Sequence, residues 1–453
     1  MVSPKIIFDE NYMFTTLIIG IFIVGYLCIV LEHNLKINKA PIALFMCVAS
    51  WTCYFLGMDY FITGTANPSE VAHSSLLHHL SEACEILFFL MAAMTIVEII
   101  DANGGFNFVR NALITSSKRK LLWRVAFITF FLSALLDNLT TSIVMVMVLR
   151  KLVTDAKERM IYASLIILAA NAGGAFSPIG DVTTIMLWIR NLVSTEGIIF
   201  SLFIPSIVSI IVPTFLLQYS LKGELPVTSV ALEQQSEDGF SAKERKTVFI
   251  IGLSGLVFVP VFKMLTGLPP YMGALLALSV LWMTTELFFR KSHNKHTSSK
   301  QRVTSILSRI DMPTILFFLG ILMTVATLQE IGALSSFGAW LNEVAAGNQY
   351  LITGIIGVAS SIVDNVPLVA GCMGMYDPSM GGDFACDGIF WQLLAYCAGI
   401  GGSMLIIGSA AGVVVMGLEK ISFGWYLRTI TGISFLGYLA GLLVYYIQTL
   451  IIP

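Results

Sequence analysis

The stretch Met160–Trp188 reads MIYASLIILAA-NAGGAFSPIGD-VTTIMLW, two apolar segments joined by Asn171–Asp181. Two adjacent glycines, a proline and a third glycine make a regular helix costly over the joining residues. In a lipid bilayer such a break persists only where protein or a water-filled cavity satisfies the freed backbone groups. The stretch therefore predicts an interrupted membrane span over residues 160–191.

A second interrupted span is predicted over residues 390–419. It holds Gly399-Ile-Gly-Gly-Ser403 followed by Gly408-Ser409-Ala-Ala-Gly412, so it has the same glycine-rich form. Unwound carbonyls and side-chain oxygens together suit a hard cation, which prefers oxygen ligands. We expect these glycines to support the two breaks: Gly173, Gly174, Gly180, Gly401, Gly402 and Gly408.

The composition places these spans in a membrane protein. Of the 453 residues, 56% are hydrophobic and 12% are charged, whereas soluble domains carry about 25% charged residues. Several further apolar runs reach the roughly 20 residues that cross a bilayer core. Met1–Tyr12 makes a poor signal peptide, so we expect Met13–Leu31 to remain as the first span. A net charge of −2 gives no basic body that would bind nucleic acid.

The basic residues indicate the orientation, because Lys and Arg gather on cytoplasmic loops. Leu121–Leu149 has basic residues on both sides, yet two spans would need about 40 residues. We therefore predict a re-entrant hairpin over residues 121–149 that turns at Asp137-Asn138. One long span is the alternative, and it would place the basic residues after it outside. The cytoplasmic blocks are Lys36–Lys39, Arg110–Arg124, Arg150–Arg159, Lys243–Lys246 and Arg290–Arg309.

A second hairpin is predicted over residues 350–375. This stretch is apolar, is also too short for two spans, and turns near Asp364-Asn365-Val-Pro367. Its flanks carry acidic residues, and no Lys or Arg occurs from Ile310 to Glu419. We therefore expect this hairpin to enter the membrane from the outside.

The two halves of the chain carry an internal repeat. Ile86-Leu-Phe-Phe-Leu90 recurs as Ile315-Leu-Phe-Phe-Leu319, an offset of 315 − 86 = 229. The Asp-Asn pair of the hairpins recurs with an offset of 364 − 137 = 227, and Gly180 recurs with an offset of 408 − 180 = 228. A near-constant offset in the same order indicates repeated structural units.

The charge pattern sends equivalent spans of the two halves in opposite directions, so the halves are inverted. The predicted fold is an all-α polytopic membrane protein with two inverted repeats, each of five transmembrane spans plus one re-entrant hairpin, and with interrupted helices at the midplane. The first repeat covers residues 1–222, a polar cytoplasmic linker covers 223–246, and the second repeat covers 247–453. This architecture is typical of secondary transporters.

Asp137 and Asp364 are the foremost candidates for an ion site. An ionisable group at membrane depth costs about 2.5–3.5 kcal/mol on insertion scales and usually marks an ion or proton path. A buried carboxylate holds either Na⁺ or H⁺, and Asn138 and Asn365 offer neutral oxygens beside it. We therefore predict Na⁺ at Asp137, Asn138, Asp364 and Asn365. The alternative is that each Asp caps the second helix of its hairpin.

Asp181 and Ser409 occupy equivalent positions at the ends of the two breaks. Asp181 is a candidate ligand or proton carrier, or it is the N-cap of the helix that starts at Val182. Ser177 and Ser409 are candidate ligands, or they satisfy loose backbone groups. We expect His78 and His79 to precede the third span in a solvated outer loop, although a histidine pair titrates near neutral pH. No GxSxG, HExxH or P-loop pattern appears, so we expect no enzymatic activity.

Three motifs resemble those of the NhaD-type Na⁺/H⁺ antiporters, which belong to the broader ion transporter superfamily. The motifs are Glu85-Ile-Leu-Phe-Phe-Leu-Met-Ala-Ala-Met-Thr-Ile-Val-Glu98, Asp137-Asn-Leu-Thr-Thr-Ser-Ile-Val144 and Asn171-Ala-Gly-Gly-Ala-Phe-Ser-Pro-Ile-Gly-Asp-Val-Thr-Thr184. The resemblance implies exchange of Na⁺ and Li⁺ for H⁺ across a bacterial inner membrane. It also implies a scaffold domain, a transport domain, a homodimer and no cofactor. The site residues that it implies are Asp137, Asn138, Ser177, Asp181, Asp364, Asn365 and Ser409.

The chain departs from strict symmetry, because Gly408-Ser409 stands where the first break has Gly180-Asp181. The two pseudo-equivalent sites are therefore chemically unequal. The alternative function is an anion carrier of the same superfamily that moves a dicarboxylate or oxyanion with Na⁺ or H⁺. Neither hairpin tip and neither break holds a Lys or Arg, which favours a cation. A channel is a third class, and exchange flux that saturates would distinguish a carrier from it.

Overall fold

The computed structural model describes residues 5–31, 35–64, 67–106, 109, 112–221, 223–224, 240–291 and 302–451. Within these residues the regular structure is helical, apart from an isolated bridge between Ser117 and Glu224. Eight of the described helices are long and apolar enough to cross a membrane. They are α1 (Lys5–Val30), α3 (Lys39–Leu56), α5 (Pro68–Ala102), α11 (Thr195–Leu217), α12 (Ala242–Thr266), α13 (Pro270–Lys291), α15 (Met312–Glu330) and α22 (Thr431–Ile451).

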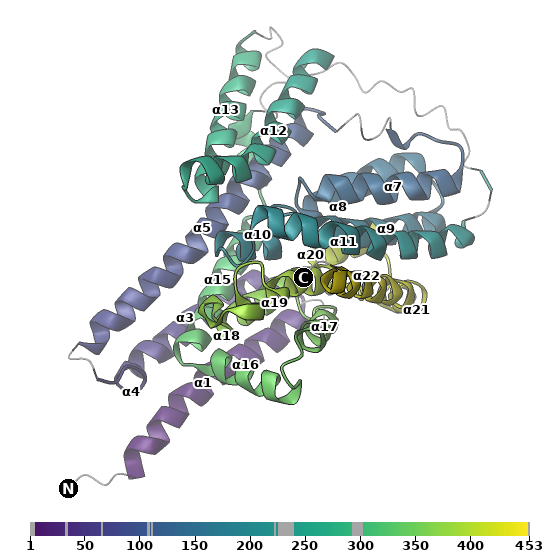
Figure 1. Ribbon diagram of the computed structural model, residues 1–453. Helices are drawn as coiled ribbons and strands as arrows, with labels where there is room; N and C mark the ends of the chain where they lie inside the picture. Colours follow the sequence, from purple (N-terminus) through teal and green to yellow (C-terminus); the bar gives the residue numbers. More distant parts are fainter. Residues whose placement is uncertain are drawn as a thin grey trace. The chain divides into compact units, whose positions relative to one another are not determined.

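Shorter helices form the interrupted spans and the hairpins (Figure 1). The first interrupted span is α9 (Ala156–Ala175) and α10 (Val182–Ile189), and the second is α19 (Ile389–Gly401) and α20 (Ala410–Glu419). The hairpins are α7 (Lys118–Ser133) with α8 (Asn138–Leu152), and α17 (Gln349–Ala359) with α18 (Asn365–Met375). The predicted fold class is confirmed: an all-α polytopic membrane protein with two inverted repeats, each of five spans plus one hairpin.

The first break begins later than the sequence predicts. Helix α9 continues through Gly173 and Gly174 and ends at Ala175, so the break runs from Phe176 to Asp181. Likewise Gly401 ends α19, and the second break runs from Gly402 to Ser409. The backbone breaks therefore contain Gly180, Gly402 and Gly408 only, and the other predicted glycines are helical for a packing reason described below.

The third span also differs from the prediction. Helix α5 starts at Pro68, so His78 and His79 lie inside a helix rather than in a loop. His79 is buried, and its Nε2 lies 2.9 Å from Oε1 of Glu330 in α15. The sequence patterns did not predict several short helices: α4 (Met58–Phe61), α14 (Val303–Ile306), α16 (Ala333–Val344) and α21 (Phe423–Thr429).

The structure divides into two compact units. Unit 1 comprises Met1–Phe88, Asp311–Asn348 and Val366–Met380, and unit 2 comprises Phe89–Ile310, Gln349–Asn365 and Gly381–Pro453. Each unit draws on both halves of the chain, and the repeat boundaries at 1–222 and 247–453 stay predictions. Residues 225–239 of the predicted linker and residues 292–301 of the last basic block lie outside the described residues.

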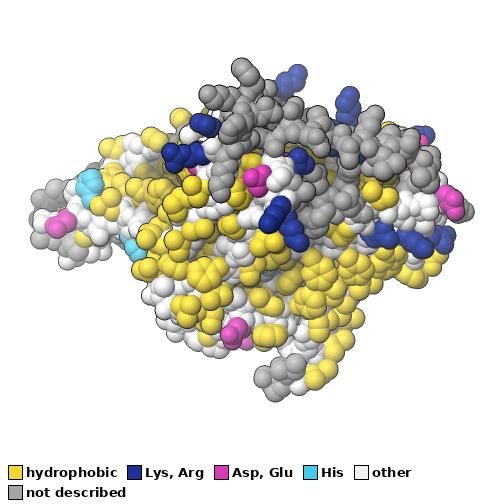
Figure 2. All heavy atoms as spheres, turned by 90° about the horizontal axis from the view of Figure 1, so that it is seen from above, with side chains coloured by type: hydrophobic (Ala, Val, Ile, Leu, Met, Phe, Trp, Pro, Cys, Tyr) yellow, Lys and Arg dark blue, Asp and Glu magenta, His cyan; other side chains and the backbone are white. Residues whose placement is uncertain are grey.

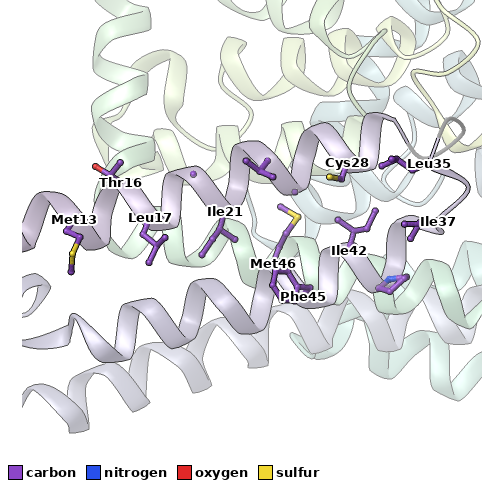
Figure 3. Close-up of a pocket in the computed structure, with 14 residues that line it drawn as sticks. Met13, Thr16, Leu17, Ile21, Cys28, Leu35, Ile37, Ile42, Phe45 and Met46 are labelled. Carbon is purple, nitrogen blue, oxygen red and sulfur yellow. The ribbon is translucent and has the colours of Figure 1, made fainter.

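Unit 1 is built around α3, which packs against α1 and α15. Trp51 of α3 donates its Nε1–H to the carbonyl of Met323 in α15, at 2.9 Å. A groove of about 1140 Å³ runs between α1 and α3, lined by apolar side chains such as Leu17, Ile21 and Phe45 (Figure 3). None of the described side chains that line the groove is charged, so this lining does not resemble an ion site.

In unit 2, α9 packs against both arms of the first hairpin and against α11, α19 and α20 (Figure 1). Large hydrophobic side chains remain exposed along the long helices, among them Phe45, Phe200 and Met264. Figure 2 shows such side chains spread over much of the visible face. This pattern suits helices whose outer faces contact lipid tails.

Candidate functional site

The carboxylate of Asp181 joins the two hairpin tips. Its Oδ2 accepts hydrogen bonds from Nδ2 of Asn138 and from Nδ2 of Asn365, each at 3.1 Å. Asn138 is the first residue of α8, and Asn365 is the first residue of α18. Asp181 is only 1% exposed, so a carboxylate from the first break is buried between amide groups from both halves of the chain.

A second branch of the same network reaches the other break. Nδ2 of Asn138 also lies 3.1 Å from Oδ1 of Asn171, and Nδ2 of Asn171 donates to Oγ of Ser409 at 3.0 Å. Ser409 is the N-cap of α20 and accepts from the backbone N–H of Gly412 at 3.2 Å. Both interrupted helices and both hairpin tips therefore contribute to one buried polar cluster in unit 2.

Close backbone packing places the hairpins at this cluster. A Cβ atom at Gly173 would lie 2.1 Å from the carbonyl oxygen of Phe130, and one at Gly401 would lie 2.1 Å from that of Gly357. These helical glycines thus let each interrupted helix touch the first arm of a hairpin. Hydroxyl groups join the same pairs of segments, because Ser133 donates to the carbonyl of Ala170 and Ser360 donates to that of Ala398, each at 2.7 Å.

Asp137 takes the position of a helix cap. Its Oδ1 accepts from the backbone N–H of Thr140 at 2.8 Å, and its Oδ2 accepts from the Thr140 hydroxyl at 2.5 Å. Asp364 immediately precedes α18, as Asp137 precedes α8. A negative charge on either residue acts on Asp181 by electrostatic repulsion. The capping alternative is therefore realised for Asp137, and it leaves the carboxylate near the cluster.

Ser177 forms a hydrogen bond with a backbone carbonyl, which is the alternative to a role as an ion ligand. Its hydroxyl donates to the carbonyl of Ala134 at 2.5 Å, which joins the first break to the turn of the first hairpin. Asp181 likewise caps α10, since its Oδ1 accepts from the backbone N–H of Thr183 at 3.3 Å. The capping alternative is therefore realised for Asp181, and its other oxygen remains directed at the hairpin amides.

Two buried hydroxyl groups, on residues that closely follow Asn138 and Asp181 in the sequence, lack hydrogen-bond partners in the described part of the chain. They are Oγ1 of Thr141, one helical turn after Asn138, and Oγ1 of Thr183, two residues after Asp181. A buried polar group without a partner is costly, and such exceptions often belong to a ligand or water site. Both oxygens are therefore candidate ligands for an ion held at Asp181.

Asn171 and Thr183 were not predicted as site residues from the sequence. Thr141 follows the hairpin Asn within a turn, but packing and bonding to its own helix is an equally good interpretation of that threonine. The available signal for Asn171 was its amide, which ends the apolar run Met160–Ala170 two residues before Gly173. Thr141 and Thr183 follow a hairpin Asn and a break Asp by less than one helical turn each. Only the structure shows that both threonine hydroxyls are left without partners.

The cluster combines a buried carboxylate with amide and hydroxyl oxygens. Among the described residues, no three His, Cys, Asp or Glu side chains converge closely enough to hold a metal ion. The hydrogen bonds to the Asp181 carboxylate come from amide and backbone N–H groups rather than from Lys or Arg. A buried carboxylate with neutral oxygens around it suits a monovalent hard cation or a proton.

Comparison with known proteins gives close relatives over nearly the whole chain. A family described as citrate transporters, CitMHS, matches residues 26–393. "Sodium/proton antiporter 2" of Arabidopsis thaliana is 44% identical over 434 residues, which cover 94% of this chain and 97% of that protein. "Sodium/proton antiporter 1" of the same plant is 47% identical over 94% of this chain and 71% of its own length.

A bacterial relative and a solved structure extend the comparison. "Na(+)/H(+) antiporter NhaD" of Vibrio cholerae is 30% identical over 452 residues, covering 94% of this chain and 90% of that protein. The crystal structure of the Alcanivorax borkumensis YdaH transporter matches with a TM-score of 0.58 and 11% sequence identity. It covers 90% of this chain and 98% of its own, so the two chains share a fold.

Proposed function

Because the chain belongs to the NhaD-type sodium/proton antiporters within the CitMHS family, we propose that it exchanges Na⁺ for H⁺ across a membrane. We extend the proposal to Li⁺, which resembles Na⁺ in its preference for oxygen ligands. The observation that carries the site is the meeting of Asn138 and Asn365 on one oxygen of Asp181. Alternating access suits a site that is enclosed by segments of both repeats.

Competition between the two ions follows from the burial of Asp181. An uncompensated charge in a site of low dielectric is unfavourable, so the carboxylate holds either a cation or a proton. When Na⁺ binds, the side-chain amides of Asn138 and Asn365 turn their oxygens toward it in place of their N–H groups. Thr141 and Thr183 then supply hydroxyl oxygens that lack partners in the described structure. Proton uptake displaces Na⁺ and restores the amide hydrogen bonds.

Asp137 and Asp364 support the same exchange from the hairpin tips. A negative charge on either residue attracts a cation to Asp181 and opposes release of that cation until a proton replaces it. We propose that Na⁺ contacts Asp137 or Asp364 on its path and that Asp181, with the hairpin amides, forms the occluded site. Ser409 orients Asn171 within this site.

An anion carrier is the alternative that the family description raises. A dicarboxylate at the midplane requires a Lys or Arg, or a set of uncommitted N–H groups, to balance its charge. The amides of Asn138 and Asn365 are already directed at a carboxylate of the protein. A negative Asp181 repels an anionic substrate, and we therefore propose cation exchange rather than citrate transport.

The location and assembly form a further part of the proposal. The chain is a multi-pass membrane protein, and we propose the inner membrane of a bacterium on the basis of its NhaD-type motifs. Its two plant relatives are more similar to it than the bacterial one reported above. Cell fractionation with an epitope tag distinguishes a bacterial inner membrane from a plant organelle. The homodimer implied by the resemblance stays a prediction. It can be tested by measuring the mass of the purified protein in detergent.

The proposed activity is tested in everted vesicles from cells that lack their own antiporters. An acid-inside pH gradient is followed with a fluorescent dye while Na⁺, Li⁺ or K⁺ is added to the outside. We expect Na⁺ and Li⁺ to collapse the gradient, and we expect Asp181→Asn to abolish this response. Asp155→Asn is the matched control, because Asp155 also caps a helix but lies at the exposed start of α9.

The same vesicles also give the result that would overturn the proposed exchange of Na⁺ for H⁺. Protein that is present in the membrane and gives no response to any cation between mildly acidic and strongly alkaline pH does not exchange these ions. Uptake of labelled citrate by the same vesicles would then support the anion carrier. Activity that survives in Asp181→Asn would retain antiport and remove Asp181 from its centre.

A further inference from the structure

Glu419, the last residue of α20, is a buried acid outside the site described above. Its side chain is 1% exposed and binds two arginines from the first half of the chain. Oε1 lies 2.7 Å from Nε of Arg150, near the end of α8, and Oε2 lies 2.5 Å from Nε of Arg159, in α9. One carboxylate thus joins three helices of unit 2.

The same arginines bind the carbonyls at the ends of these helices. Arg150 donates to the carbonyl of Leu418 in the last turn of α20. Nη1 of Arg159 donates to the carbonyls of Val153 and Thr154, at 3.1 and 3.3 Å, just after α8 ends. Helix ends leave carbonyls without partners, so these contacts satisfy groups that would otherwise be costly to bury. The ends of α8 and α20 are therefore held by one set of charges.

The opposite ends of the same two helices carry the candidate site. Helix α8 begins at Asn138 and helix α20 begins after Ser409, and Asn171 bonds to both side chains. The two helices pack against each other and run parallel, because Asn171 bridges their N-terminal ends and an ion pair between Arg150 and Glu419 joins their last turns. At 1.5 Å per residue, the charge cluster lies about 15–18 Å from the site along either helix.

We propose that Glu419 is a positioning residue for cation exchange. By binding Arg150 and Arg159, it fixes the axial register of α20 against α8, and so the spacing of Ser409 and Asn138 on either side of Asn171. Buried ion pairs often add little net stability compared with apolar residues but define a particular packing arrangement. The inference rests on the proposed antiport, since the spacing matters only if the cluster binds the transported ion.

The experiment measures antiport in the same vesicles over a range of Na⁺ concentrations and pH values. We expect Glu419→Gln to raise the Na⁺ concentration for half-maximal exchange by about 10- to 100-fold, with a smaller change in the maximal rate. We expect Glu419→Asp, which keeps the charge, to recover part of the loss. Glu158→Gln is the matched control, because it removes an interhelical pair of 2.5 Å with Lys118 in the same unit, and it should leave the half-maximal concentration unchanged.

A double variant separates positioning from a general loss of folding. If Glu419 acts through Arg159, Glu419→Gln combined with Arg159→Gln is no worse than the more affected single variant, because coupled residues are non-additive. The inference is overturned if Glu419→Gln keeps the wild-type concentration and pH dependence, or if Glu158→Gln is equally affected. Should Glu419→Gln fail to reach the membrane, Glu419→Asp and Arg150→Gln give the same comparison. Inactive wild-type vesicles would instead refute the proposed antiport.

Discussion

Nδ2 of Asn365 lies 3.1 Å from Oδ2 of Asp181, which binds the tip of the second hairpin to the break in the first interrupted helix. Because Asn138 donates to the same oxygen at the same distance, the carboxylate is shared by residues that the repeat makes equivalent. No second carboxylate matches Asp181, since Ser409 occupies its equivalent position. The site therefore combines two amide residues that the repeat makes equivalent with one carboxylate that has no equivalent.

The shared oxygen predicts that the two hairpin amides have similar importance. Asn138→Ala or Asn365→Ala removes the amide oxygen that each residue turns toward bound Na⁺ in the proposed exchange, and a polar contact with a charged group is worth about 1.5–3 kcal/mol. We expect either substitution to raise the half-maximal Na⁺ concentration by about 10- to 100-fold, the equivalent of that energy. Asn67→Ala, at an exposed residue that bonds to Glu70, should have no effect. A large loss in one amide variant and none in the other would contradict a shared site.

The two buried hydroxyl groups without partners predict that a substitution there lowers the Na⁺ affinity without lowering the stability of the protein. Thr183→Val keeps the shape of the side chain and removes a buried oxygen that has no partner in the described structure. Such a change is close to neutral for folding or slightly stabilising. We expect the thermal stability to be kept while the Na⁺ affinity falls, as measured by thermal unfolding and vesicle assays. Unchanged affinity with lower stability would show that the hydroxyl serves packing instead.

Two substitutions of Asp137 separate the effect of its helix cap from the effect of its negative charge. Asn caps helices about as well as Asp, whereas Ala at an N-cap costs about 0.5–2 kcal/mol. We therefore expect Asp137→Asn to keep the stability of the protein and Asp137→Ala to lower it. Both variants should reduce Na⁺-dependent exchange, because both remove a negative charge near Asp181. Wild-type exchange by Asp137→Asn would leave capping as the role of this residue.

The close approach at Gly173 predicts a strong effect of one methyl group. In Gly173→Ala the new Cβ would lie 2.1 Å from the Phe130 carbonyl oxygen, so the hairpin arm must move. Overpacking of this kind costs about 1–3 kcal/mol, and we expect a lower unfolding temperature in detergent. Gly417→Ala is the control, since its Cβ meets no atom within 4 Å in α20. Equal unfolding temperatures for the two variants would refute the packing role.

Much of this architecture can be predicted from the sequence because charge and glycine patterns act locally. Basic residues on both sides of Leu121–Leu149 predicted the first hairpin, and the structure has α7 and α8 there. Gly180 and Gly408 correctly marked the two breaks. Gly173 did not, because helical packing against a carbonyl and a helix break both favour glycine, and the sequence alone does not distinguish them.

The site was only partly predictable, because its contacts join distant segments. Asn171 and Ser409 are 238 residues apart and meet through one hydrogen bond of 3.0 Å. Asp137 and Asp364 were the foremost candidates from the sequence. The structure instead directs the oxygens of Asp137 at Thr140 and places Asp181 at the junction of the hairpins. Which of several buried acids faces its partners depends on side-chain directions that only the assembled helices define.

Competition between Na⁺ and H⁺ for Asp181 can be measured as Na⁺ binding to the purified protein at a series of pH values. If one proton displaces one ion, the Kd for Na⁺ rises as pH falls, approaching about tenfold per pH unit once the proton form dominates. Asp181→Asn should lose this pH-dependent binding, whereas Asp155→Asn should keep it. A wild-type Kd that stays constant across the series, or a pH dependence that persists in Asp181→Asn, would show that Na⁺ and H⁺ do not compete for Asp181.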